Sequence, residues 1–525
     1  MSHPSVRGNI IANFLGNFWA GVVSFLFIPW YIHYLGMESY GLIGFFGVLQ
    51  GVFALLDLGL SATLNRELAS ASETSEHNSE KHHLVRTLEV IYWLVALVAG
   101  IGIVLLAPWL ASNWFRNNEL PFDTVRTSIA LMGITLVFQA PYAFYLGGLM
   151  GLQRQILASL YSSICATLRP LGAIAFLITV KPTLEVFFAW QAGISLASVL
   201  GIRTLLRQAL GASCESPRFQ MNKLYKVWRF AAGMSGISFL NILLLNLDKI
   251  ILSRILTLTD FGYYSLAATI AALIFRLSGP VFSSGFPRLT QVASQGNVET
   301  LSRLYHQLNQ VVSVLVFPAV SVLGFFAPEL LLAWTRNYEI ANNTVPLLRL
   351  LLIGNLVNSS QLLPLALQYA FGWTRLALMQ SLGAAALLIP TLYVATMTWG
   401  AIGAAAVWSG VNLLSCAIGI LFMHKRLLPK EIVPWMIRDI AKPLVAAMGM
   451  GCLGRLVISG VTSWWWFGME MAVVALGIYL GTALLAPATR AILCEIWYHR
   501  LSPASTRPLQ AVVKGADGGN DVPSD

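Results

Sequence analysis

The sequence predicts an all-α integral membrane protein with about 14 transmembrane helices, and three observations support this. Of the 525 residues, 57% are hydrophobic and only 11% are charged, whereas soluble domains carry about 25% charged residues. Apolar runs of about 20 residues, the length that spans a bilayer's hydrocarbon core, recur along the chain. Lysine and arginine gather in alternate connecting segments. No connecting segment is long enough to hold a catalytic domain, so we do not expect an enzyme.

The apolar runs determine the number of spans. They begin near Ile11, Gly41, Leu88, Val125, Leu157, Leu184, Phe230, Phe261, Asn309, Val345, Leu376, Gly400, Ile440 and Ser463. The first run, about 10–32, is too long for the apolar part of a signal peptide and lacks a small-residue cleavage site. We interpret it as the first membrane helix. The longest inner connecting segments are predicted at about 63–86, 203–229 and 286–308.

The positive charges predict the orientation of the spans. If the N-terminus is cytoplasmic and the spans alternate, 23 of the 33 lysine and arginine residues face inward and 5 face outward, with the remaining 5 inside spans. Such a bias is expected for a multi-pass membrane protein with both termini in the cytoplasm. It also explains the net charge of +10, so we expect no nucleic acid partner.

A weak internal repeat suggests the domain organisation. Tyr34–Gly41 and Ile255–Gly262 each contain an aliphatic helix end, a short turn with an acid, and an aromatic residue followed by glycine. Repeats are common in transporters, with the substrate site between them. We expect two six-helix lobes around a central cavity plus two additional C-terminal helices: an N-terminal lobe at 1–210, a basic cytoplasmic linker at 211–229, a C-terminal lobe at 230–428, an extra helix pair at 429–487, and a partly disordered cytoplasmic tail at 488–525.

Polar residues inside spans are the candidate site residues, because a charge at mid-membrane costs about 2.5–3.5 kcal/mol on insertion scales. In the eighth span, small and polar residues recur every three or four positions along one helix face. They are Ser265, Thr269, Ala272, Arg276, Gly279 and Ser283. This stripe is either a cavity wall, with Arg276 as the cation for an anionic substrate, or a packing seam of small residues with Arg276 tied to a neighbouring acid.

The seventh span carries Asn241, Asp248 and Lys249. Asp248 and Lys249 are adjacent, so their side chains point about 100° apart on a helix and do not simply pair. Lys249 is a candidate for substrate contact and Asp248 for ion coupling. Asp57, in the second span, is a second candidate for ion coupling, although pairing with an arginine is equally consistent with its position.

Four further residues complete the predicted site. Asn13 and Asn17 lie one turn apart in the first span. They line the inner mouth of a cavity or form hydrogen bonds between helices. Arg169 and Arg349, in the fifth and tenth spans, are candidates for binding an anion.

No cofactor or metal is expected. The segment Gly449–Gly454 matches GxGxxG but lies inside an apolar run with no preceding strand, and no P-loop pattern occurs. The five cysteines form no CxxC pair, so neither a disulfide framework nor a metal site is predicted.

Several motifs together resemble Wzx-type polysaccharide flippases of the multidrug/oligosaccharidyl-lipid/polysaccharide exporter superfamily, over roughly residues 9–425. They lie at Pro29–Ile32, Tyr34–Gly41, Leu55–Leu60, Thr63–Glu67, Gly151–Arg154, Asp248–Lys249 and Gly262–Tyr264. The resemblance implies two lobes around a cavity that opens alternately to each side of the membrane.

The resemblance also implies a function. Related proteins carry undecaprenyl-diphosphate-linked oligosaccharides across the bacterial inner membrane, and intramembrane arginine and lysine suit a diphosphate. It implies membrane lipids, a polysaccharide polymerase and other export machinery as partners. Alternatives are a drug exporter of the same superfamily, a scaffold of a glycosylation complex, or a membrane-embedded polymerase or ligase, which would need a larger outer loop.

Overall fold

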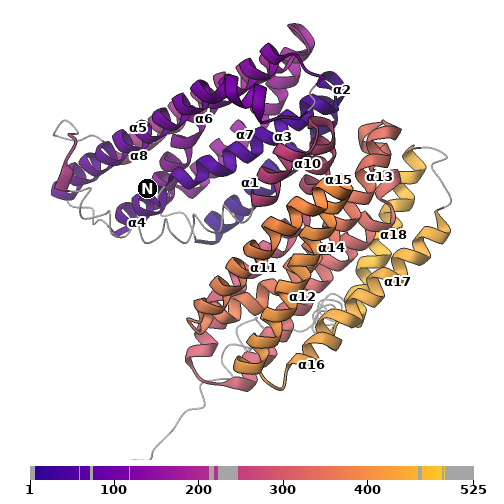
Figure 1. Cartoon of the computed structure of the whole chain (residues 1–525). Coiled ribbons are helices and arrows are strands. Elements are labelled where there is room, and N and C mark those ends of the chain that lie inside the picture. Colours follow the sequence, from indigo (N-terminus) through magenta and orange to yellow (C-terminus); the bar gives the residue numbers. More distant parts are fainter. Residues whose placement is uncertain are drawn as a thin grey trace, which may run out of the picture. The chain divides into compact units, whose positions relative to one another are not determined.

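The structure is a computed structural model that describes residues 6–57, 59–70, 75–116, 119–211, 218–222, 246–458, 464–487 and 490. These residues form helices joined by short turns, and the described ranges contain no β-strand (Figure 1). The prediction of an all-α membrane protein is confirmed.

The helices follow the predicted apolar runs closely. In chain order they are α1 (Val6–Leu26), α2 (Ile28–Leu35), α3 (Met37–Ala54), the 3₁₀ turn η1 (Leu55–Asp57), α4 (Leu60–Ser70), α5 (Ser75–Asn113), α6 (Phe122–Gly151), α7 (Gln155–Thr179), α8 (Leu184–Leu210), α10 (Leu258–Ala271), α11 (Leu273–Ser294), α12 (Val298–Phe325), α13 (Ala327–Thr335), α14 (Tyr338–Ala370), α15 (Thr374–Leu427), α16 (Ile432–Pro434), the π-helical η2 (Trp435–Ala441), α17 (Lys442–Val457) and α18 (Trp464–Leu485).

Twelve helical segments of the described residues are long and apolar enough to cross a membrane. One of them, α15, contains two helices, because the backbone at Gly400 is non-helical with φ 59° and ψ −143°. The twelve segments therefore hold thirteen of the predicted spans. Most of the remaining span, which begins near Phe230, lies outside the described residues.

Two predicted connecting segments are helical instead. The segment 63–86 forms most of α4 and the start of α5, and the segment 286–308 is covered by the end of α11 and the start of α12. Hydropathy marks where a helix lies in hydrocarbon, but backbone hydrogen bonding continues the helix into water. Helix ends therefore extend beyond the apolar runs.

The described residues divide into two compact units. Unit 1 lies within Met1–Arg276, Phe326–Asn358 and Thr374–Gly419, and unit 2 within Leu277–Phe325, Ser359–Trp373 and Ile420–Asp525. These units group the residues differently from the predicted lobes, and the predicted lobe boundaries stay a prediction.

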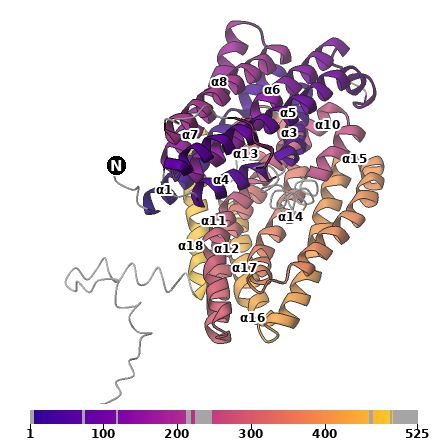
Figure 2. The ribbon, with the colours of Figure 1, turned by 90° about the vertical axis from the view of Figure 1, so that its left-hand side faces the viewer.

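The core of unit 1 includes α5, α6 and α8, which lie side by side in Figures 1 and 2. Leu88 of α5, Phe144 of α6 and Ile202 of α8 are fully buried among them. In unit 2, α17 and α18 both pack on α12. Ser321 of α12 donates a 2.7 Å hydrogen bond to the carbonyl of Ala447 in α17. The additional C-terminal helices therefore pack on the rest of unit 2.

The two copies of the predicted repeat meet within unit 1, where α3 packs on α10. A Cβ atom added to Gly41 would collide with the carbonyl oxygen of Leu258. Reciprocally, a Cβ atom on Gly262 would lie 2.7 Å from the carbonyl oxygen of Met37. Gly41 and Gly262 hold the same position in the two copies, so the contact is nearly symmetric and requires glycine on both sides.

Candidate functional site

The small-and-polar stripe of the eighth span crosses a break between two helices. α10 and α11 meet at Ala272, where the N–H of Phe275 donates a 3.1 Å hydrogen bond to the Ala272 carbonyl. This i→i+3 bond is tighter than the α-helical pattern. Ser265 and Thr269 therefore lie on α10, and Arg276 lies on α11.

The α10 end of the stripe is partly a packing seam. Ser265 is only 7% exposed, and its Oγ would lie 2.6 Å from a Cβ atom on Gly44 of α3. Thr269, one turn further on, is exposed. Its hydroxyl donates a 2.8 Å hydrogen bond to the Ser265 carbonyl. Of these two residues, Thr269 is the one open to a ligand.

Arg276 is exposed on α11. Its guanidinium lies directly over Gly21 of α1, so that a Cβ atom at that position would collide with Nη1. Among the described residues, Arg276 has no carboxylate partner. An intramembrane cation without a carboxylate partner suits an anionic ligand.

Arg169 of α7 lies among tyrosines that the sequence analysis did not select. Its electrostatic neighbours include Tyr31 of α2 and Tyr142 of α6. Tyr31 also neighbours Tyr40 of α3, which in turn neighbours Thr269. The structure therefore brings Arg169 and Thr269 to the two ends of a pair of buried tyrosines.

Arg169 and Arg276 both lie near the contact between α1 and α7. That contact includes a 2.8 Å hydrogen bond from Trp19 Nε1 to Thr167 Oγ1. Trp19 is two residues from Gly21, over which Arg276 lies, and Thr167 is two residues from Arg169. The tertiary structure thus places two cations from distant spans beside one helix pair.

The two intramembrane acids are held by hydroxyl groups. Asp57 accepts hydrogen bonds from the Ser61 hydroxyl and from Tyr92 Oη, the latter at 2.9 Å. Asp248, 4% exposed, accepts a 2.8 Å hydrogen bond from Tyr264. Its other oxygen, Oδ1, has no hydrogen-bond partner among the described residues. Neither acid pairs with an arginine within those residues.

The other predicted site residues are placed only in part. Lys249 is half-buried and Arg349 is exposed on α14. Asn13 and Asn17 lie on α1, but their side chains are outside the described part of the structure, and Asn241 is outside the described residues altogether. Their roles stay predictions.

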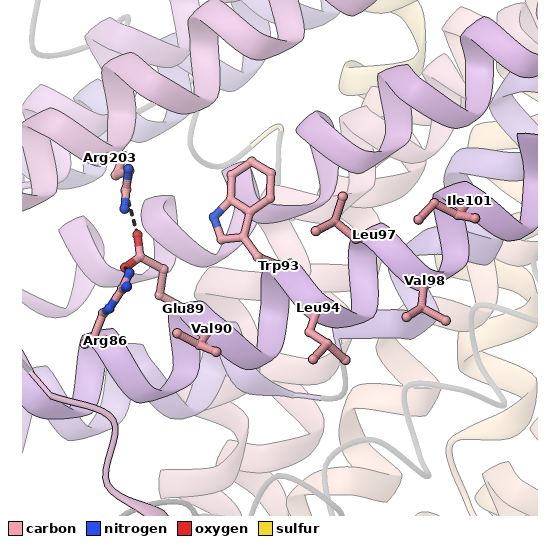
Figure 3. Close-up of a pocket in the computed structure, with 9 residues that line it drawn as sticks. All are labelled: Arg86, Glu89, Val90, Trp93, Leu94, Leu97, Val98, Ile101 and Arg203. Carbon is pink, nitrogen blue, oxygen red and sulfur yellow. Dashed lines mark hydrogen bonds and ion pairs between the residues drawn. The ribbon is translucent and has the colours of Figure 1, made fainter.

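A buried carboxylate that the sequence analysis missed connects α5, α6 and α8. Figure 3 shows this residue, Glu89, beside Arg86 and Arg203. Glu89 is 3% exposed. Its Oε1 accepts hydrogen bonds from Arg203 Nε and Tyr145 Oη, both at 2.6 Å, and its Oε2 lies 3.1 Å from Arg86 Nη1 and 3.8 Å from Arg207 Nη2. The signal in the sequence is an acid between Leu88 and Val90, at the start of an apolar run.

A second missed cluster lies in unit 2. His306 of α12 contacts Asp439 Oδ2 through Nδ1 at 2.5 Å and Glu431 Oε2 through Nε2 at 3.0 Å. Gln310 donates a 2.9 Å hydrogen bond to the other oxygen of Asp439, which is fully buried. Burial raises the pKa of the Glu431 carboxyl, but the hydrogen bond from His306 opposes this and holds that pKa below its ordinary value.

The fold defines a multi-pass helical membrane protein. Several solved structures share this fold. The chain superimposes on the lipid II flippase MurJ, inward closed conformation, with a TM-score of 0.69 and 12% identity, covering 94% of this chain and 99% of that one. The chain also superimposes on an inward-facing multidrug resistance MATE family transporter of the MOP superfamily, with a TM-score of 0.60 and 17% identity. This match covers 79% of this chain and 94% of that one.

The family follows from the sequence comparison. Residues 6–293 match the family described as "Polysaccharide biosynthesis protein", to which this chain belongs. A protein of Shigella flexneri named "Putative O-antigen transporter" is 20% identical over 399 residues, which cover 75% of this chain and 91% of that relative. The resemblance to Wzx-type flippases is confirmed, and these relatives are transporters or flippases rather than enzymes.

Proposed function

We propose that the protein is a flippase that moves an undecaprenyl-diphosphate-linked oligosaccharide across the bacterial inner membrane for surface polysaccharide biosynthesis. The observation that carries this proposal is the pair Arg169 and Arg276. Both are intramembrane cations beside the α1–α7 contact, and among the described residues neither has a carboxylate partner. Guanidinium groups in a low-dielectric site bind phosphate oxygens well.

The acids support an anionic rather than a cationic substrate. Because Asp57 and Asp248 already accept hydrogen bonds from neighbouring hydroxyl groups, their carboxylates are less available to bind a cationic drug. We assign them instead to coupling transport to protons or sodium. In this proposal Lys249 and Arg349 add positive charge, while Thr269, Asn13, Asn17 and Asn241 contact the diphosphate or the sugars.

Transport by alternating access fits the contact between α3 and α10. The two copies of the repeat touch there through glycine and backbone atoms, and no ion pair joins these two helices in the described part of the chain. Such a contact separates without exposing a buried charge. The oligosaccharide enters from the cytoplasm, where both termini lie, and only the headgroup crosses because the lipid tail stays in the bilayer.

The test is a deletion of the gene in its own host, followed by extraction of lipid-linked oligosaccharides and staining of surface polysaccharide. We expect the surface polymer to be lost and its lipid-linked repeat unit to accumulate, with both restored by a plasmid copy. An unchanged glycan profile with new sensitivity to cationic drugs would contradict the proposal and favour a drug exporter.

Arg276→Ala on that plasmid tests the site. We expect it to insert in the membrane normally but to restore no surface polymer. The matched control is Arg288→Ala on the same helix, which is exposed and donates a 2.7 Å hydrogen bond to Gln291; it should restore the polymer. Full activity of Arg276→Ala would remove this arginine from the site. Transport by purified protein that ignored both proton and sodium gradients would remove the coupling roles of the two acids.

A further inference from the structure

Unit 1 has a pocket of about 470 Å³ that the proposed transport does not use. It lies along α5, and Arg203 of α8 closes one end (Figure 3). That end is polar, with Arg86 and Glu89 beside Arg203. The rest of the lining is apolar and comes from α5. A pocket with one charged end and one apolar wall has the chemical form of a lipid site.

The charged end carries more positive than negative charge. Three arginines surround one carboxylate, and the Glu89 side chain is only 4% exposed, against 43% for Arg86, 29% for Arg203 and 56% for Arg207. The cations therefore face outward and the carboxylate does not. Arg203 bonds Glu89 through Nε, and the two terminal NH₂ groups of its guanidinium take no part in that bond.

The apolar wall lies on one exposed face of α5. Four aliphatic side chains form this face. They are 45–65% exposed and are spaced three residues apart, except for one adjacent pair: Leu94, Leu97, Val98 and Ile101. From Glu89 to Ile101 the helix rises about 18 Å. This is about half of the 30 Å hydrocarbon core, or one leaflet.

We propose that this pocket binds an anionic phospholipid of the cytoplasmic leaflet. Its phosphate lies between Arg86 and Arg203, and one acyl chain lies along the Leu94–Ile101 face. Glu89 acts as a positioning residue, because it holds the arginines at the end of the pocket. The distribution of lysine and arginine puts this end of α5 on the cytoplasmic side. The net positive charge favours an anionic headgroup over a zwitterionic one, whose own cation would be repelled.

The test is native mass spectrometry of the full-length protein in detergent, titrated with phosphatidylglycerol or phosphatidylcholine. We expect phosphatidylglycerol to bind more tightly. Arg86→Gln with Arg207→Gln should weaken phosphatidylglycerol binding by about fivefold for each arginine, and should leave the Arg203–Glu89–Tyr145 contacts in place. The matched control is Arg154→Gln, which removes one exposed arginine elsewhere on unit 1 and should bind the lipid as the unaltered protein does.

Val98→Trp tests the apolar wall separately, since the larger side chain fills the groove without touching the charges. We expect weaker binding of phosphatidylglycerol, whereas Val394→Trp, at an equally apolar position of α15 that is 59% exposed, should have no effect. Thermal unfolding of each variant shows whether it folds. Equal binding of the two lipids, or unchanged binding in both pocket variants, would overturn the proposal. So would undecaprenyl phosphate displacing phosphatidylglycerol from the pocket, since the site would then belong to the substrate lipid.

Discussion

Two contacts within unit 1 join helices in opposite ways. The Glu89 cluster connects α5, α6 and α8 by hydrogen bonds and ion pairs to a buried carboxylate. The contact between α3 and α10 depends on close approach at Gly41 and Gly262, with no ion pair among the described residues. The first joins spans within one predicted lobe, and the second joins the two copies of the repeat.

The two contacts differ in the free-energy cost of separating the helices that they join. Breaking a buried ion pair leaves an uncompensated charge in a low-dielectric surrounding, which costs several kcal/mol. Separating two helices that pack through glycine loses only short-range packing. While the helices are in contact, however, neither glycine position has room for a Cβ atom. We therefore propose that α5, α6 and α8, which are joined by charge, move together, whereas α3 and α10, which are joined by close packing, separate in the proposed transport cycle. The following predictions test this comparison.

Glu89→Ala should have the largest effect, since it leaves Arg203 and Tyr145 without their acceptor in a largely buried site. We expect a loss of about 3–5 kcal/mol in the free energy of unfolding, as for other broken buried ion pairs. Thermal unfolding of the purified protein measures it. Glu119→Ala, which removes an exposed glutamate of the same unit, should leave the midpoint unchanged. An equal midpoint for the two variants would show that the cluster does not hold the helices together.

Gly41→Ala should have an intermediate effect, because its Cβ atom would meet the Leu258 carbonyl. Overpacking of this kind costs about 1–3 kcal/mol. We also expect less surface polymer in the deletion strain, since α3 and α10 can no longer close. Gly47→Ala is the control on the same helix, where a Cβ atom would meet nothing within 4 Å. If both variants transport equally well, the glycine contact is not part of the transport cycle.

Glu431→Gln tests a charge-based contact of unit 2, where the pKa of the folded-state carboxyl is lowered. A lowered pKa means that the stabilisation is present above the unfolded pKa, about 4.3, and is lost as the pH falls through the folded pKa. We expect the unaltered protein to lose its stability advantage over the variant as the pH falls below about 4. Unfolding midpoints between pH 7 and pH 3 measure this. A constant difference across that range would contradict the assignment.

Arg207→Gln should have the smallest effect. Its Nη2 lies 3.8 Å from Glu89, and its side chain is 56% exposed. Exposed ion pairs contribute about 0–1 kcal/mol. The same thermal unfolding assay should show a shift well below that of Glu89→Ala. A shift as large as that of Glu89→Ala would mean that the outer arginines, and not the buried contacts, hold the cluster.

The candidate site was predictable only in part. Arg276 and Arg169 could be selected from the sequence, because a charged residue inside an apolar run is rare. Tyr31 and Tyr40 did not, because aromatic residues are common in membrane helices and their position between Arg169 and Thr269 depends on four different helices. Glu89 was missed for a similar reason. Its partners Tyr145 and Arg203 are 56 and 114 residues away, and no local pattern relates them.

The sequence by itself determined the class of protein and the approximate position of the spans, because the bilayer requires about 20 apolar residues for each helix whatever surrounds it. The tertiary structure decided which polar groups meet. It placed Ser265 in a seam and left Thr269 exposed, separated α10 from α11 at Ala272, and brought the glycines of the two repeat copies into contact. These outcomes depend on which face of each helix packs against which neighbouring helix. Hydropathy does not predict this long-range packing.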